Sequence, residues 1–147
     1  MLSLDANLLL YSYSKAAPEH VAARRFIESL SPREDVALSE FVLTEFYLHL
    51  RNPAVLDQPL GAPKAVEVIQ SYRRHPRWKV VSFPPAGREL HTELWRLAAT
   101  PGFARRRIYD TRTALTLRAF GVTEFATANV KDFETFGFQR VWNPVAS

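Results

Sequence analysis

The sequence contains no cysteine, and glycine occurs only five times in 147 residues. The absence of cysteine excludes a disulfide framework, a thiolate metal site and a cysteine nucleophile, so any metal must be held by oxygen or imidazole ligands. With so few glycines, the chain also has no glycine-rich phosphate-binding loop. No apolar run in the sequence approaches the roughly 20 residues needed to span a bilayer, which predicts a protein with no membrane segment.

Apolar residues are abundant enough for one core, since they make up 47% of the 147 residues. A chain of this length and composition matches a single domain, which we expect to extend over residues 1–147. The first residues lack the basic segment of a signal peptide, and Asp5 interrupts their apolar run. These features predict a soluble, cytoplasmic protein.

Positive charge is in modest excess, with 19 Lys and Arg against 15 Asp and Glu, but it is clustered. Clusters at 24–25, 73–79 and 105–107 are compatible with a polyanionic partner. In the second cluster, Arg73 and Arg74 lie near Trp78, whose ring is suited either to stacking on a base or to anchoring the segment in the core. Each cluster is equally compatible with a solvated helix end or loop.

Apolar periodicity alternates between strands and helices along the chain. Short strands are predicted at 2–4, 36–38, 79–83, 122–127 and 138–142, and helices begin near residue 8 and cover 18–30, 39–50, 65–72, 89–99 and 110–120. Ser39 is the expected cap of one helix and Gly121 the stop of another, while residues 51–63, with three prolines, form a loop. The alternation predicts an α/β fold with parallel strands and helices on both faces. Sites in such folds form beyond the carboxyl ends of the strands.

Four acidic residues lie at the end of a predicted strand, at the start of an apolar helix or within one: Asp5, Glu45, Asp110 and Asp132. Each also has an ordinary explanation. Asp5 and Asp110 are placed near helix starts, although Asn7 is by position the better cap of the first helix. Glu45 has apolar neighbours one turn away, which predicts burial, with a salt bridge to an arginine as the alternative explanation. Asp132 lies in a segment that also reads as a polar turn.

Together the four carboxylates suit metal-assisted hydrolysis of a phosphodiester. Hard oxygen ligands favour Mg²⁺ or Mn²⁺, and such an ion activates a water and offsets charge on the phosphoryl oxygens. Without metal, repulsion among the acids is expected to raise the pKa of at least one of them. Other kinds of site fit less well, because the four histidines lack the spacing of a zinc motif and no serine stands in a nucleophile elbow.

Several short motifs follow one another in a characteristic order. They are LDAN at 4–7, VLTEF at 42–46 after a serine at 39, YD at 109–110 before a helix of small residues, and FATANVKDF at 125–133. In this combination the chain resembles the PIN-domain family and, more narrowly, the VapC-type toxin ribonucleases of bacterial toxin–antitoxin pairs. The resemblance covers essentially the whole chain.

The resemblance implies a PIN-like three-layer α/β/α fold with a central, mainly parallel sheet, and an endoribonuclease dependent on Mg²⁺ or Mn²⁺ that acts as a type II toxin. It also implies a homodimer and neutralisation by a cognate VapB-type antitoxin. Carried over by position, the catalytic acids and metal ligands are Asp5, Glu45, Asp110 and Asp132, and the residues that orient them are Asn7, Thr127 and Asn129.

Arg112 stands where many members of that family have a small apolar residue, so it is expected to alter RNA contacts close to the acids. Arg73 and Arg74 are further candidates for RNA contact. Two other functions fit the same residues: a non-catalytic nucleic-acid-binding or regulatory module of this fold, and a DNA-processing nuclease of related fold. Four aromatic residues are apolar enough for an interface but are expected in the core, namely Tyr11, Phe41, Tyr47 and Trp95.

Overall fold

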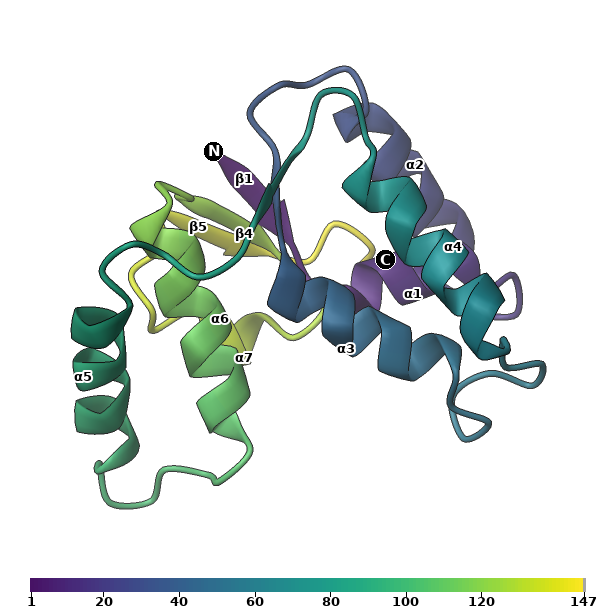
Figure 1. Ribbon diagram of the computed structural model, residues 1–147. Helices are drawn as coiled ribbons and strands as arrows, with labels where there is room; N and C mark the ends of the chain where they lie inside the picture. The colour runs from purple at the N-terminus through teal and green to yellow at the C-terminus, as the bar shows by residue number, and fades with distance from the viewer. Residues whose placement is uncertain (147) are drawn as a thin grey trace.

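The computed structural model describes residues 1–146 and alternates strands with helices (Figure 1). In chain order the elements are β1 (Leu2–Leu4), α1 (Ala6–Tyr13), α2 (His20–Leu30), β2 (Ala37–Ser39), α3 (Glu40–Leu50), α4 (Ala62–Arg73), β3 (Lys79–Val81), α5 (Gly87–Ala98), α6 (Arg107–Ala119), β4 (Glu124–Ala126), α7 (Val130–Phe133) and β5 (Arg140–Trp142). The predicted strands at 79–83, 122–127 and 138–142 are therefore shorter than expected, while their order is as predicted.

The strands pair only in parallel within residues 1–146. β1 lies beside β4, β4 beside β5, and β2 beside β3. A parallel bridge between Leu2 and Val36 joins the two groups, and the Leu2 amide donates to the Asp35 carbonyl at 2.8 Å. The order across the sheet is thus β3-β2-β1-β4-β5. Because all strands point the same way, the residues that follow β1, β2 and β4 gather at one edge.

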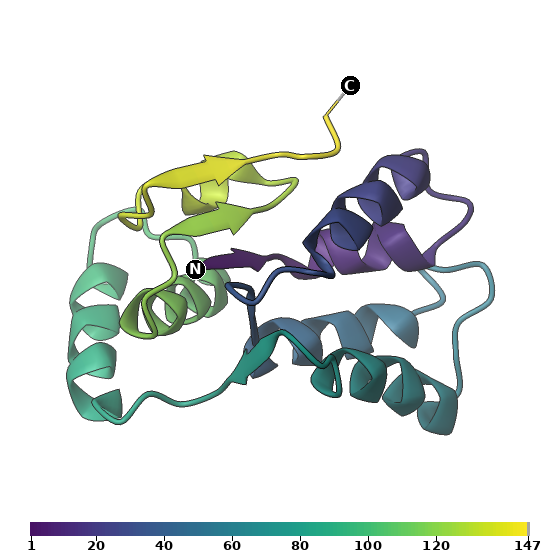
Figure 2. The same ribbon diagram turned by 90° about the horizontal axis from the view of Figure 1, so that it is seen from above.

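Side chains alternate across the sheet and form a core on each face. On one face Leu4 and Leu38 pack with α1, α2, α3 and α4, and on the other Phe125 and Val81 pack with α6 and α7. Figures 1 and 2 show the same division, with α1 to α4 on one side of the strands and α5 and α6 on the other. The expected three layers and the α/β class are confirmed. Within residues 1–146, no helix is long and apolar enough to cross a membrane.

Helix ends follow local chemistry. Ser39 caps α3 as predicted, since its hydroxyl accepts from the Phe41 amide at 3.0 Å. Gly121 ends α6 as predicted, with a φ of 87° that a side chain would disfavour. The prediction that Asn7 caps the first helix was wrong. Asp5 has extended backbone and accepts from the Ala6 amide at 2.8 Å, so Asp5 alone separates the end of β1 from the start of α1.

Two further expectations were wrong. Asp110 does not open α6, which begins at Arg107, and so lies in its first turn. Trp95 is not in the core but 62% exposed, because α5 turns Leu90 and Leu94 inward instead. Tyr11 and Tyr47 pack at the periphery of the core and are only partly buried.

Candidate active site

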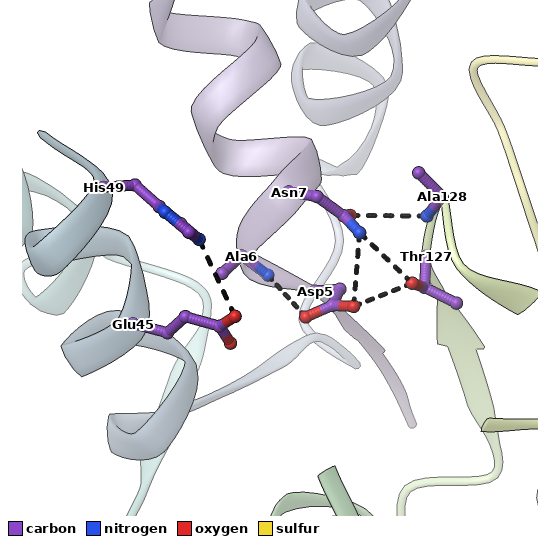
Figure 3. Close-up of polar contacts among 7 residues, drawn as sticks. All are labelled: Asp5, Ala6, Asn7, Glu45, His49, Thr127 and Ala128. Atoms are coloured by element: carbon purple, nitrogen blue, oxygen red, sulfur yellow. Dashed lines mark hydrogen bonds and ion pairs between the residues drawn. The ribbon is translucent and has the colours of Figure 1, made fainter. Parts of the chain in front are cut away.

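Asp5 is the buried centre of the site, at the point where β1 passes into α1. The residue is only 6% exposed to solvent. One carboxylate oxygen, Oδ1, accepts from the Ala6 amide at 2.8 Å, and the other, Oδ2, accepts from the Thr127 hydroxyl at 2.7 Å (Figure 3). The residue that caps α1 is therefore also the acid that β1 delivers to the edge of the sheet.

Thr127, which follows β4, and Asn7, in α1, hold Asp5 in place. The Thr127 hydroxyl accepts from the Asn129 amide at 3.0 Å while it donates to Asp5. The Asn7 amide nitrogen lies 3.4 Å from Asp5 Oδ2, and its carbonyl oxygen accepts from the Ala128 amide at 3.3 Å. Asn129 takes part through its backbone, and its side chain makes no capping bond. These contacts fix the orientation of the Asp5 carboxylate, as Figure 3 shows.

The proton affinity of Asp5 is strongly perturbed. Burial raises the pKa of Asp5 from 3.8 to about 7, the hydrogen bond from Thr127 opposes this rise, and the charge of Glu45 adds to it. Asp110 raises the same pKa by a smaller amount. An acid from α3 and an acid from α6 therefore both act on a carboxyl group at the end of β1.

Glu45 is not buried, contrary to expectation, because its side chain is 52% exposed. Of its neighbours on α3, Val42 is buried but Leu48 is 61% exposed, so this side of the helix borders solvent at the open edge of the sheet. No arginine pairs with Glu45 among residues 1–146; the carboxylate lies instead beside His49, whose Nε2 is 3.7 Å from Oε1. Figure 3 shows the Glu45 carboxylate directed from α3 toward Asp5.

Asp110 and Asp132 extend the acidic group. Burial raises the pKa of Asp110 from 3.8 to about 6, Glu45 and Asp132 add to the rise, and Arg107 opposes it. Asp132 is exposed in the first turn of α7, a short helix where the sequence also allowed a polar turn. The four acids thus come from four separate parts of the chain: Glu45 and Asp110 raise the pKa of Asp5, and Glu45 and Asp132 raise that of Asp110.

Mg²⁺ and Mn²⁺ suit this group of residues by chemistry. In residues 1–146, no set of three or more acidic or histidine side chains is placed closely enough to hold a metal ion. The donors are nevertheless hard carboxylate oxygens, and burial, with a smaller contribution from their mutual repulsion, raises the pKa of Asp5 and of Asp110. A cation would offset the repulsion among the carboxylates. Both the type of donor atom and the negative charge therefore fit a divalent metal.

Basic residues lie beside the acids. Arg112, on α6, places its guanidinium carbon 4.1 Å from the centre of the Phe41 ring. Arg73 donates to Glu40 at 3.1 and 3.2 Å and so joins α4 to α3, while Arg74 is exposed. Arg107 was missed by sequence reasoning. Its position one turn before Asp110 was the available signal, but the cluster at 105–107 also fitted a solvated loop.

A parallel sheet whose open edge carries an acid from β1, next to acids from α3, α6 and α7, defines a PIN-like fold with an acidic site. Residues 2–135 match the PIN domain family. Ribonuclease VapC24 of Mycobacterium tuberculosis is 50% identical over 147 residues, which is 100% of this chain and 99% of that protein. The chain therefore belongs to the PIN domain family, and within it to the VapC type.

Solved structures share the fold at low sequence identity. FitAcB from Neisseria gonorrhoeae is 22% identical, with a TM-score of 0.65, and the match covers 98% of each chain. VapBC2 from Rickettsia felis, bound to a DNA fragment from its promoter, is 17% identical, with a TM-score of 0.66 and 97% of each chain covered. VapC20 of M. tuberculosis, a Sarcin-Ricin loop cleaving toxin, is 16% identical with a TM-score of 0.63, over 85% of this chain and 87% of that one.

Proposed function

We propose that this protein is a metal-dependent endoribonuclease and the toxin of a type II toxin–antitoxin pair. The observation that carries the proposal is the buried Asp5 carboxyl group, whose pKa is raised by burial and by the charges of Glu45 and Asp110. The acids lie at the carboxyl edge of a parallel sheet, where α/β proteins form their sites. The full-length similarity to Ribonuclease VapC24 supports RNA as the substrate.

Asp5, Glu45, Asp110 and Asp132 would hold Mg²⁺ or Mn²⁺ through their carboxylate oxygens. When bound, such an ion would supply an activated water and offset charge on the phosphoryl oxygens. Thr127 and Asn7 keep the Asp5 carboxylate in a fixed orientation, so its oxygens remain directed at the site. Arg112 and Arg74 would contribute positive charge around the RNA backbone, whereas Arg73, the third candidate, is already paired with Glu40.

The same proposal includes a partner. A VapB-type antitoxin would neutralise the toxin by covering or entering the acidic site, and the protein would form a homodimer in the cytoplasm. The similarity to a VapC-type ribonuclease over the whole chain supports this assignment. The product of a small neighbouring reading frame should therefore co-purify with the chain and inhibit its cleavage of RNA. An unaffected activity in the presence of that product would argue against the pairing.

The decisive experiment is cleavage of a mixed pool of structured RNAs by the antitoxin-free chain, with Mg²⁺, with Mn²⁺ and with chelator. We expect cleavage that requires metal and is lost in Asp5→Asn and in Asp110→Asn. Asp57→Asn is the matched control, because Asp57 is an exposed acid in the loop between α3 and α4. Retained cleavage in both site variants would refute the proposal. Binding without cutting would favour the regulatory module, and a preference for branched DNA would favour a DNA-processing nuclease.

A further inference from the structure

An aromatic surface lies between α3 and α6, next to the acids. It consists of Phe41, Phe83 and Tyr109. Phe41 and Phe83 meet edge to face with ring centres 5.3 Å apart. Phe83 is 68% exposed and Tyr109 is 58% exposed, so two of the three aromatic residues are largely open to solvent. Large rings that remain this exposed beside a charged site need an explanation that core packing does not give.

Arg112 is fixed at the centre of this surface. Its guanidinium carbon lies 4.1 Å from the centre of the Phe41 ring and 6.0 Å from that of Tyr109. Other arginines, such as Arg24 and Arg33, pair with carboxylates. Within residues 1–146, Arg112 has no carboxylate partner, and its Nε is buried without a hydrogen-bond acceptor. A guanidinium held by aromatic stacking and left without an anion is prepared to bind one.

The aromatic surface borders the acids on both helices. On α3, Phe41 precedes Glu45 by four residues, which is about one helical turn or roughly 6 Å along the axis. On α6, Tyr109 and Arg112 flank Asp110 in sequence. The charges of Glu45 and Asp110 act on each other across the same two helices that Phe41 and Arg112 bridge. The aromatic surface therefore lies within about one helical turn of two of the acids.

We propose that the aromatic surface binds an unpaired nucleotide of the RNA substrate next to the bond that is cut, with its base stacked on Tyr109 or Phe83 and its phosphate bound by Arg112. This inference rests on the proposed ribonuclease function. A base offers its face to a protein ring only when it is unpaired and unstacked. The surface thus selects single-stranded segments, and the free positive charge of Arg112 favours a polyanion as the occupant over an apolar partner.

The test measures binding of a short, fluorescently labelled, mixed-sequence RNA oligonucleotide by anisotropy, with Asp5→Asn in every protein to prevent cleavage. Tyr109→Ala should weaken binding roughly tenfold, the size expected for one stacked base, while Tyr109→Trp should restore it. Arg112→Ala should weaken binding and reduce the salt dependence by about one counterion. The controls are Val21→Ala and Arg25→Ala, which remove an exposed apolar group and an exposed charge from α2.

The outcomes separate this inference from the proposed function. If the protein with Asp5 intact cleaves RNA but Tyr109→Ala and Arg112→Ala bind the oligonucleotide as Asp5→Asn alone does, the aromatic surface is not a substrate site and only the inference fails. No binding to Asp5→Asn, or equal binding of the oligonucleotide and its duplex, would also overturn the inference. Light scattering provides a further outcome. If Tyr109→Ala has a lower molar mass than the protein without this substitution and an unchanged affinity for RNA, the surface is an interface between two copies of the chain and the inference fails. No cleavage by the intact protein would remove the proposed function itself.

Discussion

At the scale of the residue, Asp5 carries two roles with opposite effects on stability. As the cap of α1, it satisfies the Ala6 amide. As a buried acid close to Glu45 and Asp110, it resists ionisation. Its pKa is about 7 in the folded chain, against 3.8 ordinarily. The folded state holds this proton more tightly than the unfolded state, so the stabilising contribution is present below about pH 4 and is lost as pH rises to about 7.

Asp5→Asn should therefore stabilise the metal-free protein at alkaline pH while it removes activity. An asparagine keeps an oxygen for the Ala6 amide and carries no charge, so we expect the free energy of unfolding at pH 8 to rise by about 1–3 kcal/mol. The gain should shrink toward pH 4.5, where the wild-type carboxyl group is protonated. Urea unfolding in chelator at the two pH values measures this difference. A gain of equal size at both, or a loss at pH 8, would contradict the assigned cause.

Thr127 is the second residue on which the geometry depends. Its buried hydroxyl donates to Asp5 at 2.7 Å and accepts from the Asn129 amide at 3.0 Å. Thr127→Val keeps the shape but leaves both partners unpaired, which should cost about 1–3 kcal/mol in the free energy of unfolding. It should also move the acidic limb of the pH–rate profile to higher pH, because the hydrogen bond from Thr127 lowers the pKa of Asp5.

The control for that variant is Thr127→Ser, which retains the hydroxyl. It should keep the wild-type pH–rate profile and lose little stability. A profile shifted equally in the valine and serine variants would show that the methyl group, and not the hydrogen bond, controls Asp5.

At the scale of the element, α3 and α4 are joined by Arg73 and Glu40, with Nη2 and Oε2 at 3.1 Å and side chains 41% and 33% exposed. A pair this exposed should have a coupling energy of about 0.5 kcal/mol in a double-mutant cycle of Arg73→Ala and Glu40→Ala. We expect KM for RNA to change little in either variant, because Arg73 is already occupied. A KM that rises only in Arg73→Ala would show that Arg73 contacts RNA as well, as its basic segment suggested.

The presence of the helices and two of their ends were predictable, whereas the starts of α1 and α6 were placed too late in the sequence. Ser39 and Gly121 marked an N-terminus and a C-terminus correctly, since a capping hydroxyl and a residue with positive φ act within a few residues of themselves. The parallel pairing was also predictable from the alternation of elements. Strand ends were not, because strands of three residues are limited by pairing with distant segments that the local sequence does not reveal.

At the scale of the whole molecule, the sequence pointed to acids that affect one another's pKa but not to their surroundings. Asp5, Glu45 and Asp110 act on one another's charge, although they lie far apart in the chain. The exposure of Glu45 could not be predicted, because it depends on where α3 passes the open edge of the sheet. Its apolar neighbour Leu48 is itself 61% exposed, so an apolar sequence context did not mean burial.

Because the acids repel one another in the metal-free protein, a bound cation should stabilise the entire fold. At a metal concentration about a hundredfold above Kd, linkage adds about 2.7 kcal/mol, which corresponds to a rise in Tm of about 5–10 °C for a chain of this size. Thermal unfolding at pH 8 with Mn²⁺, with Mg²⁺ and with chelator measures the rise without any need for substrate. The rise should be smaller at pH 6, where Asp5, with a pKa of about 7, is mostly protonated.

Asp5→Asn and Asp110→Asn should each lose most of that rise, whereas Asp57→Asn should keep it, because Asp57 is exposed in the loop after α3. The comparison isolates the site, since all three variants remove one negative charge and differ only in where they remove it. An equal rise in all three would mean that the metal acts on the net charge of the surface. In that case the carboxylates at the sheet edge would not form a metal site, whatever their effect on one another's pKa.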